Sequence, residues 1–168
     1  AIYLEQKLED FDRYATDDIR TQLGFKRYSK YQNEKVFSLM YQNASASLAQ
    51  DKGVILDATY AVSARRQRAY NLASDFGADV LLIEFCCSEG QAKRRMKVRK
   101  KNEGLYTPPK NTRVYNKVRE QWQDPIDDLV NNPHVTLIRY DTETSFFQDI
   151  RINERIKGLV DKIKGLLI

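Results

Sequence analysis

Three stretches of the sequence carry side chains whose types and spacing could do chemistry, and the first is ATDDIR at positions 15–20. It places Asp17 three residues before Arg20, where a strand candidate gives way to a helix. At such a turn the carboxylate could accept a proton while the guanidinium binds a substrate anion through paired hydrogen bonds. The alternative is an ordinary helix N-terminus, with a cap and an acid in its first turn.

The second candidate is Asp57, which ends the apolar run GVILD at 53–57. Ligands of open parallel sheets gather beyond the carboxyl ends of the strands, so a carboxylate in this place faces a site rather than the core. The alternative is a structural role, in which Asp57 caps the following helix or binds loop amides.

The third candidate is a basic run that begins two residues after a capping-box pattern formed by Ser88 and Gln91. Arg95 and Arg99 are four residues apart and therefore share one face of a helix, where two guanidinium groups could clamp phosphates. The alternative is a solvated basic face. The run comprises Lys93, Arg94, Arg95, Lys97, Arg99, Lys100 and Lys101.

The hydrophobic pattern predicts the elements that must position these side chains. Short apolar runs alternate with longer stretches of helical spacing, which predicts the α/β class, with a parallel sheet covered by helices. Strands are expected at 11–16, 54–58, 79–86 and 135–141. Helices are expected at 1–9, 31–50, 62–76, after Ser88, at about 112–123, after Asp124 and Pro125, and as an amphipathic C-terminal helix over 146–168.

Composition limits the classes of protein to consider. A chain of 168 residues with 42% hydrophobic content suits one domain spanning 1–168. Lys and Arg total 28 against 23 for Asp and Glu, and this net charge of +5 favours a polyanionic ligand such as a nucleotide, RNA or DNA. One histidine and two adjacent cysteines argue against zinc sites and against Ser-His or Cys-His catalysis. No apolar run reaches the roughly 20 residues of a membrane span, so we expect a cytoplasmic protein with no membrane partner.

Five stretches in this order resemble the P-loop kinases of the polynucleotide-kinase-like, zeta-toxin-like group, which includes small predicted bacterial kinases labelled AAA. They are ATDDIRTQLG, RYSK before the long helix, GVILDATY with the arginines after it, the apolar strand followed by the arginine helix, and YDTE. The resemblance covers residues 1–142. It implies a P-loop NTPase kinase fold that uses ATP and Mg²⁺ and transfers a phosphate to a hydroxyl of a nucleic-acid 5′ end, a nucleotide or another small molecule.

The resemblance also implies roles for individual residues. Asp17 matches the general base that takes the proton of the acceptor hydroxyl, and Arg20 matches the arginine that binds the acceptor's phosphate, with Thr59 as a further substrate-binding residue. Asp57 matches the strand-end acid that supports the magnesium ion. Arg95 and Arg99 match the lid arginines that clamp the donor phosphates and complete the set of catalytic and ATP-binding residues. The alternative, in a shifted register, is that Arg94 takes the place of Arg95.

One departure from the family pattern is large. The phosphate-binding motif G-x-x-x-x-G-K-S/T is absent, and AIYLEQKL at 1–8 looks like the helix that follows it. We therefore expect a chain truncated at its N-terminus, without the first strand and the phosphate loop, in a sheet whose family order is 2-3-1-4-5. This departure keeps a second function open, a non-catalytic basic module of kinase ancestry that binds nucleotide or RNA. The sequence leaves the oligomeric state open.

Overall fold

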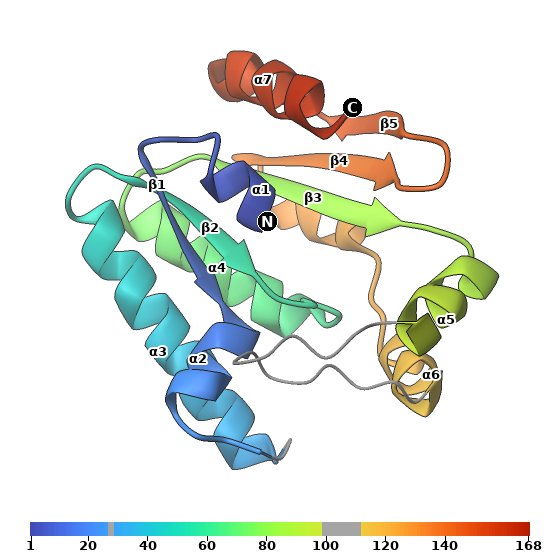
Figure 1. Ribbon diagram of the computed structural model, residues 1–168. Helices are drawn as coiled ribbons and strands as arrows, with labels where there is room; N and C mark the ends of the chain where they lie inside the picture. The colour runs from blue at the N-terminus through green and yellow to red at the C-terminus, as the bar shows by residue number, and fades with distance from the viewer. Residues whose placement is uncertain (27–28, 99–111) are drawn as a thin grey trace. The chain divides into compact units, whose positions relative to one another are not determined.

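The structure is a computed structural model that describes residues 1–26, 29–98 and 112–168. The described residues form two compact units, the first within 1–59 and the second comprising 60–98 and 112–168. Each unit has its own sheet with helices packed beside it, so the α/β class is confirmed (Figure 1). The prediction of one domain stays a prediction, and the two units are described separately.

The first unit is built on two parallel strands, β1 (Phe11–Ala15) and β2 (Gly53–Asp57). Their register pairs Ala15 with Asp57, so both strands end at the same level. Gly53 lies against the ring of Phe11, and an added Cβ would overlap that ring. A glycine is therefore required where β2 begins.

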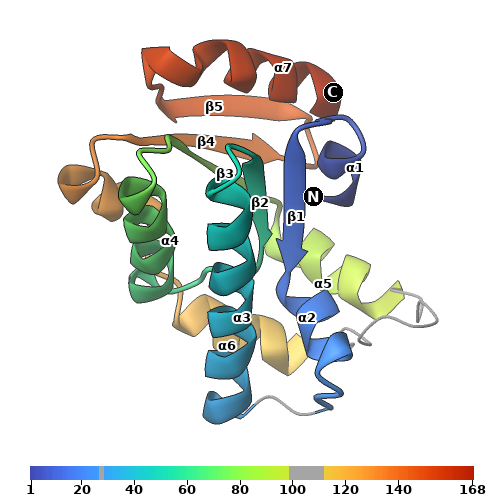
Figure 2. The same ribbon diagram turned by 90° about the vertical axis from the view of Figure 1, so that its left-hand side faces the viewer.

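Three helices accompany this pair of strands: α1 (Ile2–Glu5), α2 (Thr16–Gln22) and α3 (Lys30–Leu48). Ser29 caps α3 by accepting a hydrogen bond from the amide of Gln32 at 3.1 Å. Along α3, Val36, Met40 and Ala44 recur every four residues and are completely buried, as their spacing predicts. Figure 2 shows α3 running beside β1 and β2.

Hydrogen bonds fix the face of the sheet that α3 covers. Ser47 of α3 donates to Asp12 at 2.7 Å and is 2.7 Å from the hydroxyl of Tyr14. Side chains alternate along a strand, so the neighbouring residue Arg13 projects from the opposite face of the sheet. That face carries the candidate site of the first unit.

The second unit is built on β3 (Val80–Cys86), β4 (Val135–Asp141) and β5 (Phe146–Arg151). β3 and β4 are parallel, and β5 pairs with β4 in the antiparallel direction. One face of the sheet packs against α4 (Ser63–Asp75) and the 3₁₀ helix η1 (Pro125–Asn131). The core there consists of Tyr70, Leu129, Val135 and Leu137, with Val80, Leu82 and Ile150 packed against it.

The C-terminal segment differs from its prediction. The helix expected over 146–168 is wrong for its first half, where β5 is followed by the short 3₁₀ helix η2 (Glu154–Ile156). Only α7 (Lys157–Leu167) is an α-helix, and it buries Val160 and Ile163. The reason is tertiary: β4 offers an edge to β5, and the pairing supplies backbone hydrogen bonds that a local pattern does not reveal.

The last residue of β5 also stabilises the start of β4. The guanidinium of Arg151 donates to the carbonyl oxygens of Val135 at 2.9 Å and Leu129 at 2.8 Å, and also to that of Asn132. One side chain thereby satisfies three carbonyl groups of the segment that leads from η1 into β4.

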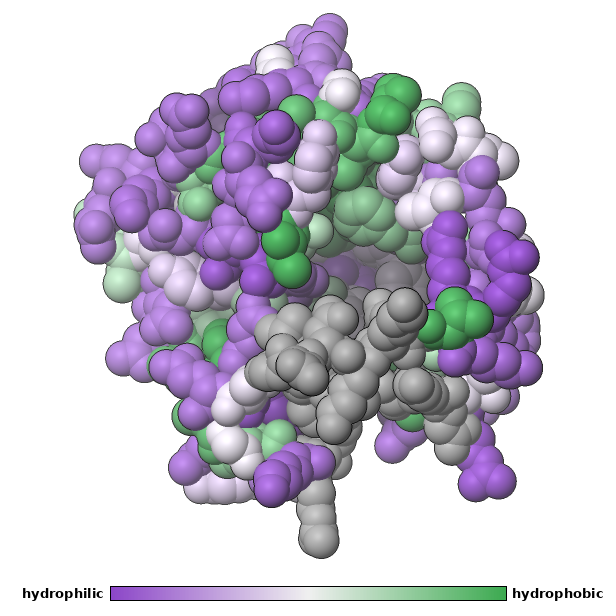
Figure 3. All heavy atoms as spheres, in the orientation of Figure 1, coloured by the Kyte–Doolittle hydropathy of each residue, from purple (hydrophilic) through white to green (hydrophobic). Residues whose placement is uncertain are grey.

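Two further helices complete the second unit, α5 (Glu89–Val98) and α6 (Thr112–Glu120). Ser88 caps α5 by accepting from the amide of Gln91 at 3.3 Å, which confirms the predicted start of this helix. Asp124 likewise caps η1 by accepting from the amide of Ile126 at 2.9 Å. Hydrophilic side chains cover much of the face drawn in Figure 3, and apolar side chains appear there as separate patches.

Candidate functional site

In the first unit, the face of the β1–β2 pair opposite α3 carries an arginine surrounded by acids. Arg13, whose side chain is 11% exposed, donates through Nε to Glu5 at 2.9 Å, through Nη2 to Asp18 at 2.5 Å and through Nη1 to Asp57 at 3.2 Å. Because Ala15 pairs with Asp57, strand alternation puts Arg13 and Asp57 on the same face. One guanidinium thus joins α1, α2 and the end of β2.

The electrostatics of this cluster favour a permanently charged arginine. Burial would lower the pKa of Arg13, but its hydrogen bonds to Glu5 and Asp18 outweigh that effect and raise the pKa above the ordinary value. Three carboxylates surround a single guanidinium, so acidic groups outnumber basic ones. The guanidinium of Arg13 is the cation that these three carboxylates share.

The predicted residues Asp17, Asp57 and Thr59 all belong to the first unit. Asp57 is confirmed as the last residue of β2, and its carboxylate is 45% exposed. Asp17 is exposed in the first turn of α2, whereas its neighbour Asp18 is the acid that binds Arg13. Thr59 is exposed two residues beyond β2.

Arg20 occupies a different environment from the one its predicted role suggests. It is only 3% exposed, and its Nη2 donates to Oδ1 of Asn33 in α3 at 2.7 Å. The guanidinium therefore ties α2 to α3 in this structure.

In the second unit Arg95 lies on α5 and binds the turn that follows β4. Its Nη1 donates to Oγ1 of Thr142 at 2.6 Å, and its Nη2 donates to the carbonyl of Thr142 at 3.1 Å. The amide and hydroxyl of Thr142 in turn donate to the carbonyl of Cys86, at 2.9 Å and 3.1 Å. Arg95 is therefore held at the carboxyl ends of β3 and β4. Arg94 is exposed on the same helix, and Arg99 lies outside the described residues.

A second contact fixes the N-terminus of α5 to the same turn. The carboxylate of Glu143 accepts from the backbone amide of Ser88, and hydrogen bonds from Ser88 hold the pKa of Glu143 below its ordinary value. Asp141 shapes the turn by accepting from the amides of Glu143 at 2.8 Å and Thr144 at 3.2 Å. The YDTE stretch thus acts as the anchor of the arginine-bearing helix.

The helices α5 and α6 contact one another through charged side chains. Glu89 binds Lys93 at 2.5 Å and also binds Arg119, and the hydrogen bond from Lys93 is the largest cause that lowers the pKa of Glu89. Nζ of Lys93 lies 5.5 Å from the centre of the Tyr115 ring. A polar hollow of about 450 Å³ between these helices is lined by Glu89, Lys93, Asn116, Arg119 and Glu120.

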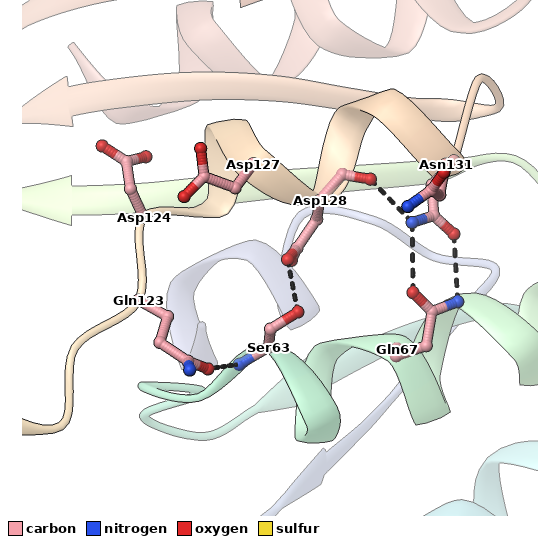
Figure 4. A pocket seen from close by; sticks show the side chains of 8 residues that line it. Ser63, Gln67, Gln123, Asp124, Asp127, Asp128 and Asn131 are labelled. Atoms are coloured by element: carbon pink, nitrogen blue, oxygen red, sulfur yellow. Dashed lines mark hydrogen bonds between the residues drawn. The ribbon is translucent and has the colours of Figure 1, made fainter.

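A further pocket of about 240 Å³ lies between α4 and η1 (Figure 4). One lining residue, Asp128, forms a buried ion pair with Arg66; both side chains are 2% exposed, and they approach to 2.5 Å. Asp128 also accepts from Ser63 at 2.5 Å and from Tyr70 at 3.1 Å. The lining residues are Ser63, Gln67, Gln123, Asp124, Asp127, Asp128, Asn131 and Asn132.

The ion pair shifts the pKa values of Asp128 and Tyr70. Burial would raise the pKa of Asp128, but hydrogen bonds from Arg66 and Ser63 outweigh it and lower the pKa. The pKa of Tyr70 is raised, first by burial and then by the charge of Asp128. Every buried polar group named here has a partner, and these contacts join α4 to η1.

Sequence reasoning missed Arg13, Asp18 and Thr142. The only local signal was a charged residue in the middle of the strand FDRYA, where an arginine needs acidic partners if it is buried. Among residues 1–26, 29–98 and 112–168, no group of three or more His, Cys, Asp or Glu side chains is arranged to hold a metal ion. The same part of the chain contains no helix with the length and apolar character needed to cross a membrane.

Comparison with known protein families gives one finding. A family model described as an AAA domain matches residues 4–125, which is well over half of the chain. The matched range includes β1, β2, β3 and α5, and it ends at Pro125, the first residue of η1. A search of curated proteins gives no match.

Proposed function

Because the chain belongs to the AAA-domain family, a P-loop NTPase family of kinase type, we propose that it is an ATP-dependent phosphotransferase that moves the γ-phosphate to a hydroxyl group. The acceptor would be a nucleic-acid 5′ end, a nucleotide or another small molecule. The observation that carries the proposal is the acidic end of β1 and β2, where Asp57 and the first turn of α2 meet around Arg13. Phosphoryl transfer needs a base, a cation site and positioning, and acids at a strand end supply the first two.

The proposed base is Asp17. It is exposed in the first turn of α2, directly after β1, where an acceptor hydroxyl can approach its carboxylate. A general base must accept a proton, and an aspartate carboxylate can do so in its ionised form. Thr59, also exposed, would contact the acceptor.

Asp57 is the proposed support for Mg²⁺. Its Oδ2 is bound to Arg13, while the carboxylate as a whole is 45% exposed, so Oδ1 is the atom that would face the ion or its water shell. Mg²⁺ usually keeps several waters and is bound through one or two carboxylates together with substrate phosphates, so a single strand-end carboxylate is the type of ligand that it takes. When bound, the ion would neutralise charge on the transferred phosphate.

The arginines would act on phosphates. Arg95 is proposed to contact the donor phosphates, and its anchoring to Thr142 supports a fixed position for α5. Arg99 is proposed for the same task on the basis of the resemblance. Arg20 is proposed to bind the acceptor's phosphate, which requires its guanidinium to leave Asn33.

The strand pairs support the proposed fold. If β1 to β4 are strands 2 to 5 of the family, the parallel pairs β1–β2 and β3–β4 are both present in the order 2-3-1-4-5. We propose that the two parallel pairs correspond to strands 2-3 and 4-5 of the family order.

A second function is a non-catalytic basic module that binds nucleotide or RNA. The observation that favours it is the absence of G-x-x-x-x-G-K-S/T from these 168 residues, together with the basic helix α5. Such a module needs positive charge but no base, so it predicts that Asp17 has no effect on any activity.

The test is a transfer assay with γ-labelled ATP, the full-length product of the gene and a panel of acceptors: 5′-hydroxyl oligonucleotides, nucleosides and small polyols. Asp17→Asn should lower turnover by roughly two to four orders of magnitude and leave ATP affinity nearly unchanged, because the base acts only in the transfer step. Asp10→Asn is the matched control, since Asp10 is also exposed in the first unit. Equal turnover in both variants would remove Asp17 from its role, and nucleotide or RNA binding without transfer would favour the basic module.

A further inference from the structure

We propose that Arg13 is a positioning residue that sets the carboxylates of Asp18 and Asp57 relative to one another, so that the acidic end of β1 and β2 is assembled before any ligand binds. Its effect on turnover rests on the function proposed above. The effect on the geometry of the first unit does not, and the two can therefore be tested separately.

All three nitrogen atoms of the Arg13 guanidinium group make contacts. Nε, Nη1 and Nη2 each bind a different carboxylate, on Glu5, Asp57 and Asp18. The planar guanidinium group has five N–H donors in fixed directions and can hold three acceptors in place. The compact ammonium group of lysine cannot, because its three donors rotate. The arrangement is therefore specific for arginine and not only for positive charge.

Two of these partners adjoin the proposed chemistry. Asp18 follows Asp17 in the chain, so fixing the Asp18 side chain fixes the first turn of α2 and with it the direction of the proposed base. Asp57 is the proposed support for Mg²⁺, and the contact with Arg13 fixes one of its two oxygens. Arg13 is 11% exposed, whereas Asp18 and Asp57 are 41% and 45% exposed, so the acids are more accessible to a ligand and Arg13 would act through them.

The opposite face of the sheet provides a contrast. There Lys52 binds Asp12 at 3.2 Å, with side chains that are 46% and 35% exposed. This pair also connects a cation to an acid of β1, but it is solvated and involves neither Asp18 nor Asp57. Lys52→Gln is therefore a matched control for removal of one positive charge from the same unit.

The experiment compares Arg13→Gln, Arg13→Lys and Lys52→Gln in the full-length product. Turnover and KM are measured in the transfer assay, thermal unfolding reports folding, and amide hydrogen exchange of α2 reports the geometry without reference to activity. Loss of a residue that orients catalytic ligands typically costs about 10- to 100-fold in activity, so we expect kcat to fall by this factor in both Arg13 variants with little change in KM. Exchange of the α2 amides should be about tenfold faster in both, because the first turn has lost its fixed partner.

Arginine specificity is the decisive result. Arg13→Lys should restore most of the thermal stability that is lost in Arg13→Gln. Its kcat and its rate of α2 amide exchange should nevertheless stay close to the values of Arg13→Gln. Lys52→Gln should match the wild type in kcat and in α2 amide exchange. Full recovery in Arg13→Lys would overturn the proposal, because charge alone would then suffice. If the wild type transfers no phosphate, the proposed function fails, and unchanged α2 exchange in the Arg13 variants would overturn the positioning role independently.

Discussion

Replacing Asp128 with asparagine should be one of the most destabilising single changes in the second unit. Its carboxylate and the Arg66 guanidinium are each 2% exposed and are joined at 2.5 Å, so the substitution leaves a buried positive charge without its counter-ion. Removal of one partner of a buried ion pair costs about 3–5 kcal/mol. Hydrogen bonds from Ser63 and Tyr70 to the same carboxylate add to the loss. Such a cost is a large part of the roughly 5–15 kcal/mol that separates folded from unfolded domains.

The assay is urea unfolding followed by circular dichroism, with Asp127→Asn as the matched control. Asp127 lies on the same 3₁₀ helix and lines the same pocket, but it is exposed, so its replacement should change the free energy of unfolding by less than about 0.5 kcal/mol. The double variant Arg66→Met with Asp128→Leu should be less destabilised than Asp128→Asn, because no unpaired charge remains. A loss below about 1 kcal/mol for Asp128→Asn would refute the reasoning.

The pH dependence of this loss has a definite sign. The pKa of Asp128 is lowered in the folded chain: burial alone would raise it, but Arg66 and Ser63 outweigh burial. The ion pair therefore contributes fully above the unfolded pKa of about 3.9, and the contribution is lost as pH falls through the lower folded pKa. The difference between wild type and Asp128→Asn should shrink below about pH 4, and a difference that stays constant from neutral pH to pH 3 would contradict this account.

Two other substitutions test parts of the fold. Gly53→Ala should destabilise the first unit by about 1–3 kcal/mol, because its new Cβ would overlap the Phe11 ring, and the smaller side chain in Phe11→Leu should recover part of the loss in a double variant measured by thermal unfolding. Thr142→Val should cost about 0.5–1.5 kcal/mol in the same assay, since Arg95 and the Cys86 carbonyl each lose a hydrogen bond, while Thr142→Ser retains the hydroxyl and should match the wild type.

The predicted α/β class and most predicted elements are confirmed because their signals are local. Apolar runs without polar alternation gave β2, β3 and β4 within one or two residues, and the Ser88 and Asp124 caps gave the starts of α5 and η1. β5 was missed because its stability comes from pairing with β4. Ile152 and Ile156 continue the three- or four-residue spacing of Val160 and Ile163, and this local pattern predicts a helix where the pairing with β4 forms a strand instead.

The candidate site was predictable only in part for a similar reason. Asp57 could be placed at a strand end from the run that precedes it, and the structure confirms that position. Arg13 could not be identified, because its partners Glu5, Asp18 and Asp57 belong to three elements, the last of them 44 positions away. Spacing also cannot decide which of two adjacent acids turns toward a buried arginine, and here it is Asp18 and not Asp17 that does so.

The three carbonyl groups bound by Arg151 bear on the order in which the second unit can fold during synthesis. Chains leave the ribosome from the N-terminus at about 5–20 residues per second, and domains fold as their parts emerge. The segment entering β4 at Val135 needs the Arg151 guanidinium to satisfy its backbone, so it stays incomplete until sixteen more residues have been made. A nascent chain stalled before residue 151 has left the exit tunnel should hold β4 in a protease-sensitive state, although Tyr70, Leu129, Val135 and Leu137 have already been synthesised.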